Sequence, residues 1–114
     1  MKSKIAIIVA SIGIASAAIA ADPVVGTWKT DNGELADIAP CGPSFCITAK
    51  TGDYAGQKLG SFKAGPDAFT GRITDPRNKA TYSGKLTVDG DRLKLRGCAT
   101  PVLCKTQSWT RAAR

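Results

Sequence analysis

Turn-forming residues divide most of the chain into short segments, and this division limits what it can fold into. All six prolines and every glycine except Gly13 lie in residues 22–114. The runs between them alternate apolar with polar residues, as half-buried strands do, and after residue 21 no run of ten residues has a helical period. The pattern therefore predicts an all-β domain.

The strands expected from this pattern number six to eight. Residues 92–97 show the cleanest alternation, and tight-turn sequences such as Asp31-Asn32-Gly33 and Asp89-Gly90-Asp91 separate neighbouring runs. Residues 51–66 are the least regular segment, a loop with one short strand near 59–63. The other strands are expected at 24–30, 34–39, 45–50, 69–73, 82–88, 92–97 and 103–110. Such a chain makes an antiparallel meander, which is best closed into a small barrel, with a flat sandwich as the alternative.

Residues 1–21 differ from the rest of the chain. Lys2 and Lys4 precede an uncharged apolar run, residues 5–19, which ends in the small-residue sequence Ala18-Ile19-Ala20. This layout predicts a secretory signal peptide cleaved after Ala20, and so a periplasmic or secreted bacterial protein whose single domain spans 22–114. The apolar run is shorter than the roughly 18 residues that a membrane span needs. No transmembrane span is expected after cleavage.

The four cysteines are expected to form two disulfides, because exported proteins fold under oxidising conditions. Cys98 and Cys104 both have the sequence parity opposite to the apolar residues of their runs. Both sulfurs should therefore point outward, on neighbouring strands beside a short loop. Cys41 and Cys46 flank a similar loop. Pairing within each couple is favoured over the two crossed connectivities and over a zinc site, whose ligand spacings are usually closer.

Two tryptophans lie near the ends of the domain, in Gly26-Thr27-Trp28 and Trp109-Thr110-Arg111. This arrangement resembles barrels of the lipocalin (calycin) kind, in which a Gly-x-Trp on the first strand is covered by a basic side chain from the last strand. The resemblance implies that Arg111 stacks on an indole ring and closes the base of the barrel. The alternative is two ordinary core tryptophans. Both interpretations are structural.

Positive charge is concentrated in the second half of the domain. Residues 22–71 hold 4 basic and 6 acidic side chains, whereas residues 72–114 hold 10 basic and 3 acidic ones. Several basic residues fall on one face of the 92–97 strand or its neighbours, and the candidate anion-facing patch is Lys85, Arg92, Lys94, Arg96 and Lys105. The alternative is the solvated exterior of a barrel. Nucleic acid is not an expected partner, since no aromatic residues are interleaved with the basic ones.

The sequence offers little to catalysis, and no enzyme activity, cofactor or metal is expected. The chain has no histidine that could activate a serine or cysteine. Most carboxylates fall in turn sequences, where aspartate hydrogen-bonds to the backbone.

The chain contains the stretches Val25–Thr30, Pro40–Gly42 with Phe45-Cys46, Gly71–Pro76, Thr81–Thr87, Leu93–Cys98 and Thr106–Arg111. Together they resemble a family of small exported bacterial proteins, domain of unknown function family 2147. The resemblance implies an exported barrel-like domain and no particular activity. The family usually has Asn-Gly-Lys where this chain has Asn78-Lys79-Ala80, which predicts a looser turn, and it tends to have Trp at the position of Phe69.

Two functions are compatible with these features. The first is a non-catalytic binding module that holds a small apolar or amphipathic ligand at the open end of the barrel, near residues 51–66. The second is a protein-interaction or inhibitor module that uses loops and the basic strand face to bind an anionic envelope component or another protein. A cavity above roughly 300 Å³ would favour the first function.

Overall fold

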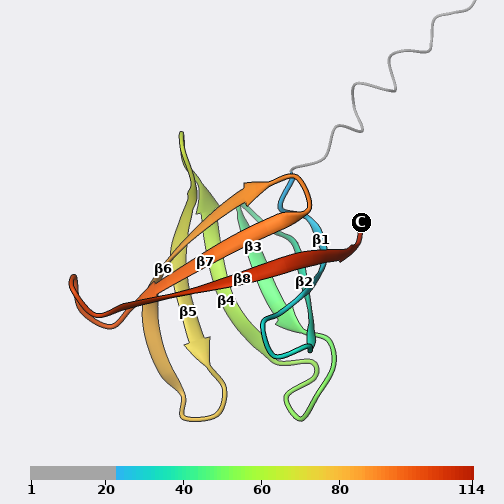
Figure 1. The fold of residues 1–114 in the computed structure, drawn as a ribbon, viewed down its shortest axis with the longest axis horizontal. Coiled ribbons are helices and arrows are strands. Elements are labelled where there is room, and N and C mark those ends of the chain that lie inside the picture. The colour runs from blue at the N-terminus through green and yellow to red at the C-terminus, as the bar shows by residue number, and fades with distance from the viewer. Residues whose placement is uncertain (1–22) are drawn as a thin grey trace, which may run out of the picture.

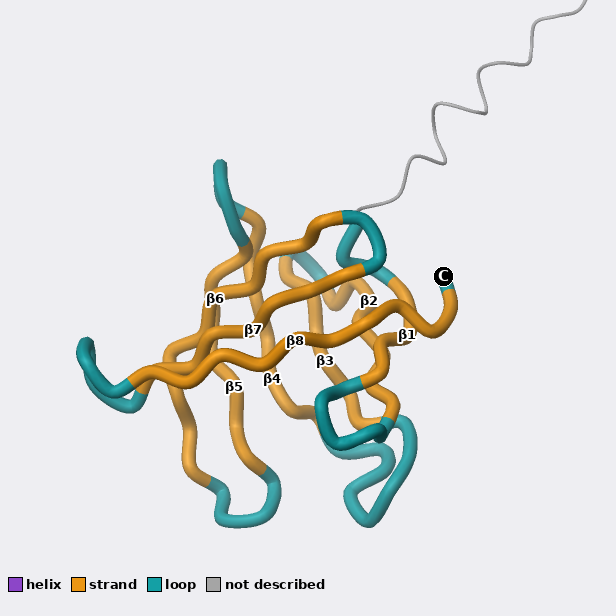
Figure 2. Tube along the Cα trace, viewed as in Figure 1, coloured by secondary structure: helices purple, strands orange, loops and turns teal. Residues whose placement is uncertain are grey.

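The computed structural model describes residues 23–114, which form eight antiparallel strands in a closed barrel (Figure 1, Figure 2). Each strand pairs with the next along the chain, and β1 also pairs with β8. The strands are β1 (Gly26–Lys29), β2 (Leu35–Cys41), β3 (Ser44–Ala49), β4 (Lys58–Ala64), β5 (Phe69–Asp75), β6 (Ala80–Asp89), β7 (Arg92–Cys98) and β8 (Cys104–Ala113). The all-β barrel prediction is confirmed. The signal peptide predicted at residues 1–21 lies outside the described residues.

Alternation along each strand separates an inner from an outer face, as the sequence pattern requires. On β6 and β7, Leu86 lies opposite Leu95, and both are buried. Their chain neighbours Lys85 and Arg96 also lie opposite each other, and both are exposed on the outside. The same register continues to β8, where Trp109 is buried beside Leu93.

Large side chains fill the interior of the barrel. The largest of those that are less than 2% exposed are Val24, Trp28, Ile38, Ile47, Phe62, Leu86 and Leu93. Phe62 lies against Gly84 so closely that a Cβ added to the glycine would be 2.8 Å from the ring. Small barrels often fill their interior in this way.

The connections of the meander alternate between the two ends of the barrel. The Arg111 end, defined by that residue, has turns at 42–43, 65–68 and 90–91, together with residues 23–25 and the C-terminus. The opposite end has connections at 30–34, 50–57, 76–79 and 99–103. The segment expected as one irregular region at 51–66 is therefore divided by β4, and its two loops lie at opposite ends. No helix in residues 23–114 is long and apolar enough to cross a membrane.

Candidate functional site

Four basic side chains occupy the outer surface of β6 and β7, and we call Lys85, Arg92, Lys94 and Arg96 the cationic face. All four are exposed. Lys85 lies directly opposite Arg96, Thr87 opposite Lys94, and Asp89 opposite Arg92. Directly opposed residues on antiparallel strands have Cβ atoms roughly 4.5–5.5 Å apart, so Lys85 and Arg96 carry two positive charges on neighbouring strands.

No member of the cationic face forms an ion pair within residues 23–114. The four salt bridges of this part of the chain use Lys50, Arg77, Arg111 and Arg114 as their basic partners. Asp89 is the acidic residue beside Arg92, at the turn that joins the two strands. Lys85, Lys94 and Arg96 stand farther from that turn, and their charges are the least compensated.

The structure corrects the position of Lys105 and adds Arg72. Lys105 lies opposite Gly97 on β8 and has the same parity as the buried Trp109, but it is exposed. Its side chain therefore lies at the rim of the barrel and not on the cationic face. The outward residues of β8 are instead hydroxyl-bearing, as at Thr106 and Ser108. Arg72 lies on β5, exposed and opposite Ser83, one strand beyond β6. In the sequence, its alternation with Gly71 and Ile73 already indicates that Arg72 lies on the outer face.

A hollow of about 270 Å³ opens on the outside of the barrel at the edge of the cationic face. Its lining residues come from β6, β7, β8 and the loop between the last two strands, and they are Ser83, Gly84, Lys85, Arg96, Cys98, Pro101 and Cys104. A second hollow, of about 180 Å³, lies at the Arg111 end between residues 65–69 and 86–88. Neither reaches the roughly 300 Å³ typical of a small-molecule site.

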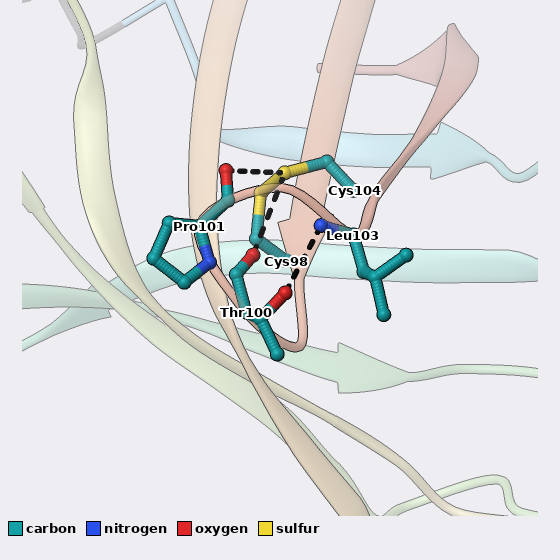
Figure 3. The surroundings of a disulfide bond; sticks show 5 residues. All are labelled: Cys98, Thr100, Pro101, Leu103 and Cys104. Carbon is teal, nitrogen blue, oxygen red and sulfur yellow. Dashed lines mark hydrogen bonds between the residues drawn. A yellow bond between two sulfur atoms is a disulfide. The ribbon is translucent and has the colours of Figure 1, made fainter.

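The β7–β8 loop, residues 99–103, is tied at its base by the Cys98–Cys104 disulfide (Figure 3). The Ala99 amide donates to the Leu103 carbonyl at 3.0 Å, and the Leu103 amide donates to Thr100 Oγ1 at 3.1 Å. Cys104 Sγ also lies 3.9 Å from the carbonyl oxygens of Thr100 and Pro101. Because a disulfide sulfur carries no proton, we treat these last two as packing contacts.

The second disulfide joins Cys41 to Cys46 across the turn between β2 and β3. The two residues are diagonal and not directly opposed, since Cys41 lies opposite Ser44 and Cys46 opposite Ala39. The structure thus holds the pairing favoured from the sequence, with no free cysteine in residues 23–114. Within the same residues, no three His, Cys, Asp or Glu side chains gather as metal ligands.

Arg111 covers Trp28 at one end of the barrel. Its guanidinium carbon lies 4.3 Å from the indole centroid, and the side chain is 5% exposed. The group donates to the carbonyl oxygens of Val25, at 2.9 Å, and of Pro23, and it pairs with Asp91 at 3.1 Å. A Cβ at position 26 would lie 2.7 Å from Arg111 Nη1, so Gly26 provides the space for this closure. Trp109 belongs to the core and donates to Gln107 at 2.9 Å.

The β5–β6 turn contains an ion pair between Asp75 and Arg77, with N and O 2.7 Å apart. The hydrogen bonds from Arg77 lower the pKa of the Asp75 carboxyl, and the same contact raises the pKa of Arg77. The Lys79 amide also donates to the Asp75 carbonyl at 2.7 Å, and the Ala80 amide to Asn78 Oδ1 at 2.9 Å. The turn is firmly hydrogen-bonded, and we assign it a structural role.

Comparison with known proteins places most of these features in one family. The bacterial family described as "Uncharacterized protein conserved in bacteria (DUF2147)" matches residues 50–111, a range that includes the cationic face and Arg111. No curated protein and no solved structure matches the chain. The matched range leaves out residues 25–49, where the sequence resemblance had extended to the first tryptophan and the first cysteine pair. Because the match covers more than half of its length, the chain belongs to the DUF2147 family of uncharacterised bacterial proteins.

Proposed function

We propose that this barrel is a non-catalytic binding module of the bacterial cell envelope, which binds an anionic component through the cationic face. One observation carries the proposal: Lys85 and Arg96 are directly opposed, belong to no ion pair in residues 23–114, and both line the hollow of about 270 Å³. Arginine and lysine side chains bind phosphate, sulfate and carboxylate groups through charge-assisted hydrogen bonds.

The energy of the uncompensated charges is compatible with this role. Alternate residues on one strand face lie roughly 6.5–7 Å apart, and two unit charges at that distance in water repel by about 0.6 kcal/mol. Salt screens such repulsion over about 8 Å at physiological ionic strength, so the fold tolerates the cluster. An anion placed between Lys85 and Arg96 would replace this repulsion by two attractions.

A small apolar ligand inside the barrel is the weaker candidate. The side chains that would surround it, including Trp28, Phe62 and Leu86, are at most 1% exposed and pack against one another. The hollow of about 270 Å³ lies on the outside of the barrel, and the one of about 180 Å³, at the Arg111 end, is smaller than a typical small-molecule site although Phe69, Leu86 and Val88 line it. The expectation of a ligand at the open end near residues 51–66 stays a prediction.

Retention on a heparin-like polyanion matrix tests the proposed function. We expect the triple variant Arg92→Ser, Lys94→Ser, Arg96→Ser to elute at a much lower salt concentration than the unmodified protein. A control variant, Lys50→Ser, Lys58→Ser, Lys63→Ser, loses the same net charge from β4 and the residues before it. If retention depends on net charge alone, both variants will elute at equally lowered salt concentrations, and that result would overturn the proposal.

A further inference from the structure

We propose that the protein docks on an anionic bilayer surface, with the cationic face against lipid phosphates and the side chains of Val102 and Leu103 inserted below the headgroups. These two residues are called the apolar tip. The inference rests on the proposed function and names its anionic partner as a bilayer. The bilayer is inferred from the placement of the apolar tip, because a soluble anion would make no contact with these two side chains.

The apolar tip is exposed to an unusual degree. Val102 is 85% and Leu103 66% exposed, and they are the exposed large hydrophobic residues of the described chain. In Figure 1 the β7–β8 loop that carries them extends away from the barrel. Single exposed apolar residues are common, whereas here two consecutive ones form one apolar patch on a projecting loop, Leu103 beside the disulfide and Val102 farther out.

The loop is held in its projecting conformation before any partner arrives. The Cys98–Cys104 disulfide closes its base, and two hydrogen bonds join Leu103 to Ala99 and Thr100. In Figure 3 the Leu103 side chain points away from the disulfide. A loop that is already ordered loses little conformational entropy on binding, so its apolar contacts contribute more fully to affinity.

The apolar tip adjoins the cationic face. Pro101, next to Val102, lines the same hollow as Lys85 and Arg96. A surface that presents phosphate groups above an apolar layer matches this arrangement, since cations would lie at the headgroup level while the apolar tip enters the layer below. A soluble polyanion would engage the cations alone, and a purely apolar partner would leave them unpaired.

Vesicle flotation tests this inference with a protein that begins at Asp22. Residues 23–114 contain all eight strands, both disulfides and the core, and removal of residues 1–21 excludes any contribution from their apolar run. We expect binding to mixed phosphatidylglycerol–phosphatidylcholine vesicles and not to phosphatidylcholine vesicles. Each Lys or Arg near an anionic surface strengthens binding roughly fivefold, so Lys85→Ser, Arg96→Ser should weaken it about 25-fold.

The double variant Val102→Ser, Leu103→Ser separates the bilayer from other anions. It should bind anionic vesicles roughly tenfold more weakly while its retention on heparin is unchanged, because only the bilayer contacts the apolar tip. Near-ultraviolet circular dichroism, which reports on the buried tryptophans, checks that each variant is folded. Lys50→Ser, Lys58→Ser serves as the charge control and should bind as the unmodified protein does.

Three results would overturn the docking proposal. They are full vesicle binding by the apolar-tip variant, equal binding to both kinds of vesicle, or binding of soluble glycerol phosphate as strong as binding of vesicles. The proposed function survives each of these if the triple variant of the cationic face still loses heparin retention. If the unmodified protein binds neither vesicles nor heparin, the proposed function is wrong as well.

Discussion

Arg111 combines a cation–π contact with several hydrogen bonds in a nearly buried position. The guanidinium lies over Trp28, contacts the carbonyl oxygens of Val25 and Pro23, and pairs with Asp91. Hydrogen bonds to charged groups contribute more than neutral ones, and their loss leaves carbonyl groups without a partner. The residue therefore connects β8 to the segment before β1, which no strand pairing reaches.

We expect Arg111→Ala to lower the free energy of unfolding by about 2–4 kcal/mol, with the cation–π contact and the buried hydrogen bonds both lost. Trp28→Ala should cost about 3–5 kcal/mol, the usual range for a buried aromatic side chain. Arg111→Lys keeps the charge but not the planar fork, so it should fall between Arg111→Ala and the unmodified protein. Denaturant melts measure all three. Changes near zero for both alanine variants would contradict the closure of the barrel by this pair.

Lys79 adopts a backbone conformation that favours glycine, with φ of +60°. A residue with a Cβ is strained in this left-handed region, so the lysine costs strain in an otherwise hydrogen-bonded turn. We expect Lys79→Gly to stabilise the protein by about 0.5–1 kcal/mol, since the relief of strain exceeds the added flexibility of the unfolded chain. Lys79→Ala, which keeps the strain, is the control. A destabilised glycine variant in thermal melts would show that the lysine side chain matters more than its backbone.

Gly84 and Gly97 form a matched pair, because they lie opposite each other on β6 and β7 and differ in the space around them. A Cβ at Gly84 would be 2.8 Å from the buried Phe62 ring, whereas a Cβ at Gly97 would meet Ile73 and Tyr82 at 3.7 Å. We expect Gly84→Ala to cost about 1–3 kcal/mol by overpacking and Gly97→Ala to be nearly neutral. Equal costs in urea melts would mean that Phe62 moves aside more easily than the packing indicates.

At the scale of single elements, the sequence predicts strands best where alternation is unbroken. Residues 92–97 were expected as a strand and form β7 with little change in its bounds. The short strand expected near 59–63 forms as β4, Lys58–Ala64, where pairing with β3 and β5 on both sides outweighs the low strand propensity of Gly60. Lys105 was misplaced although it shares the parity of Trp109 in its run, which indicates the inner face, and its position opposite Gly97 agrees with that parity.

The disulfide of the β7–β8 hairpin should contribute to stability chiefly through the unfolded chain. For a loop this short, the chain-entropy relation predicts that Cys98→Ser, Cys104→Ser lowers the free energy of unfolding by about 2 kcal/mol. Hydrogen exchange should accelerate at the Ala99 and Leu103 amides, which the closed loop holds in hydrogen bonds. The variant Cys41→Ser, Cys46→Ser should cost a similar amount without affecting those two amides. Unchanged exchange in the first variant would mean that the loop keeps its conformation without the bond.

At the scale of the whole molecule, the closed barrel brings together features that the sequence shows only separately. Periodicity predicts strands, whereas the pairing of β1 with β8 was expected from closure of the meander into a barrel and from the resemblance to lipocalin-like barrels. The hollow beside Lys85 depends on where Pro101 of the β7–β8 loop lies relative to β6, and no strand pattern encodes that placement. The basic half of the chain was visible from composition, whereas the lack of ion pairs on the cationic face required the structure.

The central claim is that an anion binds outside the barrel, on the cationic face. A nuclear magnetic resonance titration with a short heparin-like oligosaccharide at low salt tests this claim most directly. We expect the largest amide shift changes at Lys85, Lys94, Arg96 and Cys98, and little change on β2 and β3. Changes concentrated at inward-facing residues such as Tyr82 and Gln107, or spread evenly over all exposed lysines, would contradict the account.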